Sequence, residues 1–220
     1  LVAAVDAWIA GDTTTYGDIN TWNVRNINDM SQLFKDRDNF NSDIDNWNVS
    51  NVTDMSEMFE RATNFNKDIG SWKTGAVKNM LQMFQFCSNF NQNISSWETG
   101  EVTDMSYMFK ECFYFNQNIG NWNTFKVVDM LRMFNYATSF NQNLNNWLTG
   151  AVTRMSIMFE EATAFNGDIG NWDVSKVTTM ETMFKNADNF NKNIGSWDVV
   201  SVLTMKGMFN SADNFNQDIG

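Results

Sequence analysis

The stretch from Phe40 to Asn64 reads FNSDIDNWNVSNVTDMSEMFERATN, and its pattern returns every 25 residues to the end of the chain. A strict period in this range predicts a solenoid, in which each unit buries its apolar face against its neighbours and none is stable alone. The period has no insertion, and it is marked by eight tryptophans: Trp22, Trp47, Trp72, Trp97, Trp122, Trp147, Trp172 and Trp197.

Each unit is predicted to contain a short strand, a tight turn and a short helix. The strand is the Phe-Asn-x-Asp/Asn-Ile segment, as in residues 65–69, and Gly70 after it suits a turn. Within residues 52–62 the apolar positions are separated by three, three, one and three residues, which places them on one face of a helix. Thr53, just before this run, is predicted to cap the helix.

All 15 methionines fall in two repeat positions, which favours a packed core over a cofactor site. We therefore predict an α/β repeat fold: a right-handed, leucine-rich-repeat-like solenoid of about eight 25-residue rungs, each a strand, a turn and a short helix. Residues 1–14, which begin LVAAVDAWIA, are predicted to form an N-terminal capping helix, and residues 15–220 the array. Because the chain does not begin with Met and stops two residues before the next expected Trp, we expect it to be part of a longer array.

The composition argues against several classes of function. A net charge of −11 and a pI near 4.3 argue against nucleic acid and anionic membranes as partners. No apolar run is long enough for a transmembrane segment, and no signal peptide is visible. With no His, no basic residue at a fixed offset from either Cys and no glycine-rich phosphate loop, we predict that the chain is not an enzyme and uses no cofactor.

The most regular polar feature is an asparagine column, which is predicted to form a structural ladder of stacked side-chain amides. A ligand-binding role is the alternative. The members of the column are Asn41, Asn66, Asn91, Asn116, Asn141, Asn166, Asn191 and Asn216.

Three further sets of residues have two interpretations each. Asp18, Asp43 and Asp68 recur at rung spacing and are calcium candidates, although a solvated acidic face is the expected reading. Cys87 and Cys112 occupy the same position in adjacent rungs, so they either form a disulfide or remain two buried thiols. Glycosylation sequons begin at Asn48, Asn51 and Asn93, and they are either modification sites or chance occurrences in an Asn-rich chain. Asn93 lies in a predicted strand and is expected to be the least accessible of the three.

The unit FNQNIGNWNTFKVVDMLRMFNYATS, residues 115–139, resembles the 25-residue repeats of the BspA-like leucine-rich-repeat surface proteins. The resemblance covers the chain after Tyr16. It implies an extracellular or cell-surface location, adhesion and partner binding, and no enzymatic activity in the repeats.

We therefore expect a non-catalytic, surface-exposed or secreted recognition module that binds a protein or a glycan. The alternative is a structural or assembly subunit of a larger extracellular or supramolecular complex, into which the repeats continue. A third hypothesis is an ice- or crystal-face binder that uses the asparagine column, which inward-pointing asparagines would exclude.

Overall fold

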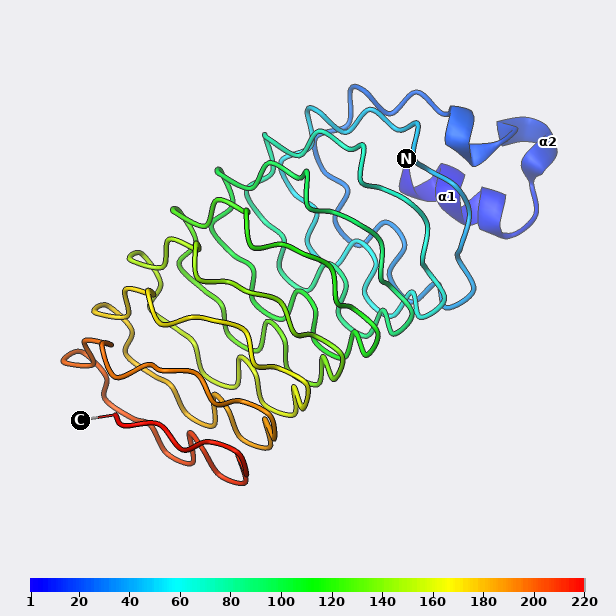
Figure 1. Cartoon of the computed structure of the whole chain (residues 1–220). Coiled ribbons are helices and arrows are strands. Elements are labelled where there is room, and N and C mark those ends of the chain that lie inside the picture. Colours follow the sequence, from blue (N-terminus) through cyan, green and yellow to red (C-terminus); the bar gives the residue numbers. More distant parts are fainter. Residues whose placement is uncertain (220) are drawn as a thin grey trace.

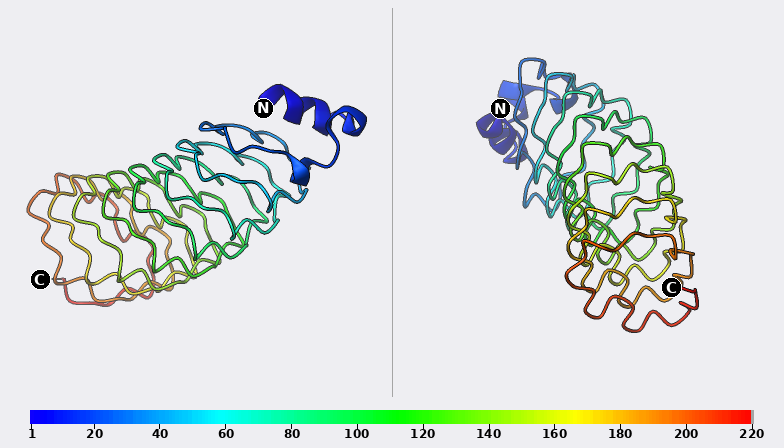
Figure 2. Two further views of the ribbon diagram at one scale, coloured as in Figure 1. Left: turned by 90° about the horizontal axis from the view of Figure 1, so that it is seen from above. Right: turned by 90° about the vertical axis from the view of Figure 1, so that its left-hand side faces the viewer.

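The computed structural model describes residues 1–219; Gly220, the last residue of the predicted array, lies outside them. The chain winds into a stack of coils that runs from a helical N-terminal end to the C-terminus at the opposite end (Figure 1). Two further views show the coils side by side along the whole stack (Figure 2). One coil is one 25-residue repeat, because the backbone bridges and many hydrogen bonds join residues 25 apart.

The helices of residues 1–219 are all at the N-terminal end: α1 (Val2–Ile9), α2 (Thr13–Tyr16) and the 3-10 helix η1 (Ile19–Thr21). Helix α1 lies in the segment predicted to be helical, and it buries Val5 in the core of the stack. An ion pair between Asp6 and Arg37 ties α1 to the first coil.

The prediction of an α/β solenoid with strand-turn-helix rungs is wrong. Inside the stack, residues 22–219 contain no helix and no extended strand, only turns, irregular segments and isolated bridges. In residues 55–62, alternate backbone N–H groups donate to the next coil, as Glu57 does to Leu81 O at 2.8 Å. Three residues between them, Met58, Glu60 and Ala62, close four-residue turns, as Met58 N–H does to Met55 O at 3.2 Å. The apolar spacing that predicted a helix therefore belongs to a backbone of consecutive tight turns.

The spacing of the coils excludes the helices. Neighbouring segments that share backbone hydrogen bonds lie about 5 Å apart, whereas packed helices need 8–10 Å between their axes. The backbone therefore bonds to the adjacent coil, and two residues in each coil take left-handed φ angles that a helix does not allow. These residues are Gln32 and Asp36, Glu57 and Arg61, Gln82 and Phe86, Tyr107 and Glu111, Arg132 and Tyr136, Ile157 and Glu161, Thr182 and Asn186, and Gly207 and Ser211. Thr53, predicted to cap a helix, instead donates its hydroxyl to Asn28 O of the coil before, at 3.1 Å.

The predicted strands are absent because side chains replace backbone carbonyls in the inter-coil bonds. The N–H of Asn66 donates to Asn41 Oδ1 at 3.0 Å, so residues 65–69 form no backbone ladder with the coil before. Strand pairing within residues 1–219 is limited to seven isolated parallel bridges, at one position per coil. They join Asp29, Asp54, Asn79, Asp104, Asp129, Arg154, Thr179 and Thr204 in succession.

The core is built from columns of equivalent side chains, as the repeat predicts. Phe59 stacks on Phe65 of the following repeat unit, with 4.1 Å between ring centroids, and on Phe84 of the next coil at 5.5 Å. The indole N–H of Trp72 donates to Ile44 O of the coil before at 3.2 Å, so the buried tryptophan leaves no unpaired polar group. Because equivalent side chains of successive coils stack on one another, the coils stay in register. Equivalent residues on the surface are therefore aligned in columns along the stack.

Candidate functional site

The asparagine column predicted from the sequence links successive coils on the surface of the stack. Asn91 Oδ1 accepts the N–H of Asn116 at 3.0 Å, and Asn116 Oδ1 accepts the N–H of Asn141 at 2.9 Å. The bond recurs through the whole column, which we call the ladder column: Asn41, Asn66, Asn91, Asn116, Asn141, Asn166, Asn191 and Asn216. These side chains lie exposed or half-buried rather than inward, so the condition that would exclude the ice-face hypothesis is not met.

The same bonds fix the orientation of each amide. Because a backbone N–H can only donate, the atom that faces it must be the amide oxygen. Gln117 Nε2 also donates to Asn91 Oδ1, at 2.8 Å. The Nδ2 groups of the ladder column have no protein acceptor among residues 1–219, and they are not among the buried atoms left without a partner. Each coil therefore presents one unused N–H₂ donor to the surface.

A second column runs beside the ladder column, and the two line a groove. At the N-terminal side its members are linked by their amides, as Asn89 Nδ2 donates to Asn64 Oδ1 at 3.2 Å. A first segment of about 700 Å³ is lined by Asn39, Asn41, Asn64, Asn66, Asn89, Asn91 and Tyr114. A second segment of about 420 Å³ is lined by Asn141, Ala164, Asn166, Asn189, Asn191 and Asn214. We call both segments together the amide groove.

Tyr114 interrupts the second column between the two segments. It takes the position held by Asn64 and Asn89 in the preceding coils, and its side chain is 61% exposed. Our sequence reasoning did not single it out. The signal was a departure from the repeat, because Phe113 and Tyr114 are aromatic where other coils carry small or polar residues.

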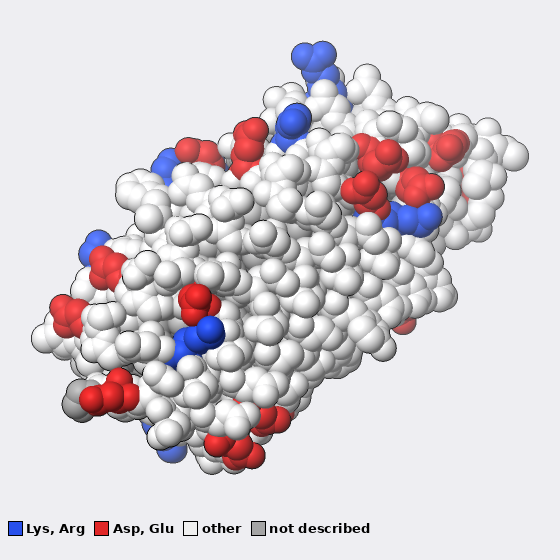
Figure 3. Space-filling view, viewed as in Figure 1, with Lys and Arg blue, Asp and Glu red and all other residues white. Residues whose placement is uncertain are grey.

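The lining of the amide groove carries no charged residue in either segment. Charges elsewhere on the stack pair between coils, as Lys126 does with Glu101 at 2.8 Å and Lys185 with Glu160 at 2.8 Å. The Lys126 ammonium lowers the pKa of Glu101 by hydrogen bonding to it. Figure 3 shows one face of the molecule, on which charged side chains cluster near the N-terminal helices and toward the C-terminal end, with a broad band free of charge between these clusters.

The acidic row does not gather into a metal site. Asp18, Asp43 and Asp68 are exposed, and Asp43 pairs with Lys67 at 3.0 Å. Asp68 Oδ1 accepts the N–H of Gly70 at 2.8 Å, so this carboxylate stabilises its own turn. No cluster of three or more His, Cys, Asp or Glu side chains with metal-binding geometry occurs in residues 1–219.

The two cysteines are free thiols in this structure rather than a disulfide. Cys87 donates its S–H to Ala62 O at 3.0 Å, and Cys112 to Phe84 O at 2.9 Å. Burial raises the pKa of both thiols well above the ordinary value. Buried, protonated thiols with carbonyl partners are poor nucleophiles.

All three sequon asparagines are exposed, including Asn93, which was expected to be the least accessible. Its segment is not a strand, and its Oδ1 accepts the N–H of Ser95 at 3.0 Å. Asn48 Oδ1 likewise accepts from Ser50 at 3.1 Å, and Asn51 Nδ2 donates to Arg25 O at 2.8 Å.

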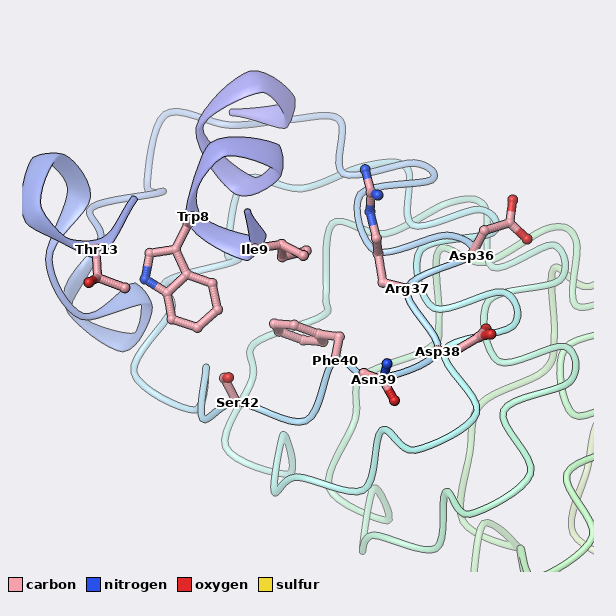
Figure 4. Close-up of a pocket in the computed structure, with 9 residues that line it drawn as sticks. All are labelled: Trp8, Ile9, Thr13, Asp36, Arg37, Asp38, Asn39, Phe40 and Ser42. Carbon is pink, nitrogen blue, oxygen red and sulfur yellow. The ribbon is translucent and has the colours of Figure 1, made fainter. Parts of the chain in front are cut away.

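A hollow of about 520 Å³ lies between α1 and the first coil. Trp8 and Ile9 reach it from α1, and the ring of Phe40 faces them from the coil (Figure 4). The indole N–H of Trp8 donates to Gly17 O at 2.9 Å, which fixes one side of the hollow. Asp36, Arg37 and Asp38 line its other edge, so its charges are mixed, unlike those of the amide groove.

A protein family described as Mycoplasma protein of unknown function, DUF285, matches three overlapping stretches of the chain: residues 5–118, 79–188 and 103–220. These stretches together span almost the whole sequence, and their overlap reflects the internal repeat. A search of curated proteins returned no match. Among the residues described, no helix is long and apolar enough to cross a membrane.

Proposed function

Because the chain belongs to the DUF285 family of repeat-containing proteins, whose function is unknown, we propose that it is a non-catalytic recognition or adhesion module, displayed on a cell surface or secreted. The assignment to the BspA-like surface proteins is part of this proposal. The observation that carries it is the amide groove, a hollow that repeats its polar groups coil after coil over most of the stack.

The chemistry of the described residues supports binding rather than catalysis. The sequence contains no histidine, and the thiols of Cys87 and Cys112 are buried with raised pKa values. Each amide oxygen of the ladder column accepts a backbone N–H of the next coil, and each amide nitrogen remains available to a partner. The same residues therefore join the coils and supply donors for recognition. Stacked repeats commonly use such an extended regular surface to bind partners.

An attachment assay with matched variants tests the proposal. Beads coated with the chain are applied to cultured animal cells and to bacterial cells, beside beads coated with an unrelated acidic protein. The groove variant carries Asn91→Asp, Asn116→Asp and Asn141→Asp, which keep the oxygen acceptors and replace three donors by charges. The control variant makes the same change in the same coils two residues further on, at Asn93, Asn118 and Asn143, where other coils hold Asp43 and Asp68.

We expect the native and control beads to attach and the groove variant to lose most of the attachment. If native beads attach to no surface better than the unrelated protein, the recognition function is wrong. Equal losses for the groove and control variants would show that the amide groove is not the binding surface.

A second candidate function is a structural or assembly subunit. The observation that favours it is a pair of apolar side chains near the last coil, Val200 and Leu203, which are 83% and 86% exposed. The coil before holds Ser175 and Thr178 at these positions, although one other coil carries the apolar Phe125 and Val128 there. Light scattering during size exclusion tests it: assembly should be lost in Val200→Ser/Leu203→Thr, and a native monomer at all concentrations would contradict self-assembly.

A further inference from the structure

The regular surface is interrupted at Tyr114, in the middle of the amide groove. The second column reads Asn39, Asn64 and Asn89 before Tyr114, and Ser139 and Ala164 after it. Tyr114 is 61% exposed, so most of its side chain lies outside the packed columns of the core and is open to a ligand. It lies where the two groove segments approach each other, with amide donors on both sides.

The groove lining selects for an uncharged ligand that both donates and accepts hydrogen bonds. A charged ligand would lose hydration there without meeting an opposite charge in the lining. The net charge of −11 further disfavours an anion. The Nδ2 groups of Asn66, Asn91 and Asn116 supply donors, and the amide oxygen of Asn89 supplies an acceptor. Neutral sugar hydroxyls match both kinds of group.

The groove is a poor site for an extended peptide. A peptide that adds to a sheet edge needs free backbone N–H and C=O groups in register. Here the N–H of Asn91 is held by Asn66 Oδ1 at 2.9 Å and that of Asn116 by Asn91 Oδ1 at 3.0 Å. The first segment offers no apolar pocket for peptide side chains beyond the ring of Tyr114. An exposed tyrosine beside amides instead suits a sugar, whose C–H face packs on the ring while its hydroxyls reach the amides.

The donors recur once per coil, at about 5 Å. A ligand with a regular repeat along the stack can therefore make the same contact in several coils. We propose that the amide groove binds a neutral, unbranched glycan that lies along the stack, with one sugar ring packed on Tyr114. This inference rests on the proposed recognition function and names its ligand class.

Calorimetry with defined oligosaccharides tests the inference. The probes are neutral hexasaccharides with gluco, manno and galacto configuration, a hyaluronan hexasaccharide as the anionic counterpart, and an uncharged Gly-Ser peptide of similar length. We expect at least one neutral hexasaccharide to bind more tightly than its trisaccharide, and no binding of hyaluronan or the peptide. If no neutral probe binds at concentrations up to about 10 mM, the glycan assignment is overturned. A dissociation constant above this limit corresponds to a binding free energy weaker than about 3 kcal/mol.

Tyr114→Ser, which installs the residue that Ser139 provides in the next coil, should weaken binding of the hexasaccharide about tenfold. Phe125→Ser is the matched control, because Phe125 is 62% exposed in the adjacent coil and lies outside the groove lining, at a position where other coils hold Ser50 and Ser175. The control should bind like the native chain. Equal affinity of Tyr114→Ser and the native chain would overturn the role of the ring.

The bead assay separates this inference from the function on which it rests. If cell attachment is lost after mild periodate oxidation of surface glycans and survives protease treatment, both stand. If attachment is lost only with protease, the recognition function stands and the glycan assignment is overturned. Binding of the hexasaccharide without any cell attachment would support the glycan site and overturn the adhesive function.

Discussion

The side-chain oxygen of Asn91 accepts the backbone N–H of Asn116 at 3.0 Å, where a parallel sheet would place a backbone carbonyl. One amide therefore joins two coils and turns its nitrogen to the surface. Because the bond repeats at every coil, the stability of the stack and the chemistry of the amide groove depend on the same atoms.

The first prediction separates these two roles of Asn91. Asn91→Ala removes the acceptor of the Asn116 N–H and of Gln117 Nε2, so it should lower the free energy of unfolding by about 1–2 kcal/mol. Asn91→Asp keeps the oxygen and should change stability by less than about 0.5 kcal/mol. Urea denaturation followed by circular dichroism measures both. Equal destabilisation by the two variants would mean that the oxygen does not hold the coils together.

The sequence predicted the repeat and the buried columns, because both depend on which residues recur. Met55, Met58 and Phe59 are buried as their spacing predicts. The same spacing did not predict the backbone, since a helix and a path of tight turns place these side chains on the same side. The distance to the next coil decides between them, and that distance depends on residues 25 positions away.

The left-handed residues carry no recognisable mark in the sequence. Glu57 and Arg61 have positive φ angles, yet their column contains few of the glycines and asparagines that tolerate them best. For the candidate site, the ladder column was evident from its repetition, whereas the groove required knowing that a second column lies beside it. Tyr114 was missed because the prediction used the residues that recur in the repeat, and Tyr114 is a residue that departs from it.

Ile157 provides a test of the left-handed column. Its φ is 64°, a region that a β-branched side chain rarely adopts. Ile157→Asn should therefore raise the free energy of unfolding by up to about 1 kcal/mol. Leu131→Asn is the control, because Leu131 is also a half-buried apolar residue and is not among the positive-φ residues. It should be neutral or destabilising, and equal changes at both positions would contradict backbone relief at Ile157.

The thiols of Cys87 and Cys112 should be unreactive in the folded protein. Burial raises the pKa of each thiol, and both S–H groups are bonded to carbonyls, so little thiolate forms at neutral pH. Ellman's reagent should label neither cysteine in native buffer and both in guanidinium chloride. Labelling in guanidinium that appears only after a reductant is added would reveal a disulfide and contradict the free thiols of the structure.

Asp129 and Asp173 should affect the pH dependence of stability in opposite directions. Burial raises the pKa of Asp129 despite its hydrogen bond from Leu131 and the nearby Arg154, whereas hydrogen bonds from Ser175 lower the pKa of Asp173. A raised folded-state pKa means that the stability contributed is present below the unfolded pKa and is lost as pH rises through the folded value. A lowered folded-state pKa means that the stability contributed is present above the unfolded-state pKa and is lost as pH falls through the folded-state pKa.

At pH 7 Asp129→Asn should therefore raise the urea midpoint and Asp173→Asn should lower it. Both differences from the native chain should shrink as the pH falls, because the native carboxyls then become protonated: that of Asp129 first, at its raised pKa, and that of Asp173 only at more acidic pH. Urea midpoints measured between pH 7 and pH 3 in steps of half a unit check this. A midpoint shift of the same sign for both variants at pH 7, or a shift that is constant across the range, would contradict the environments that the structure gives to these two carboxylates.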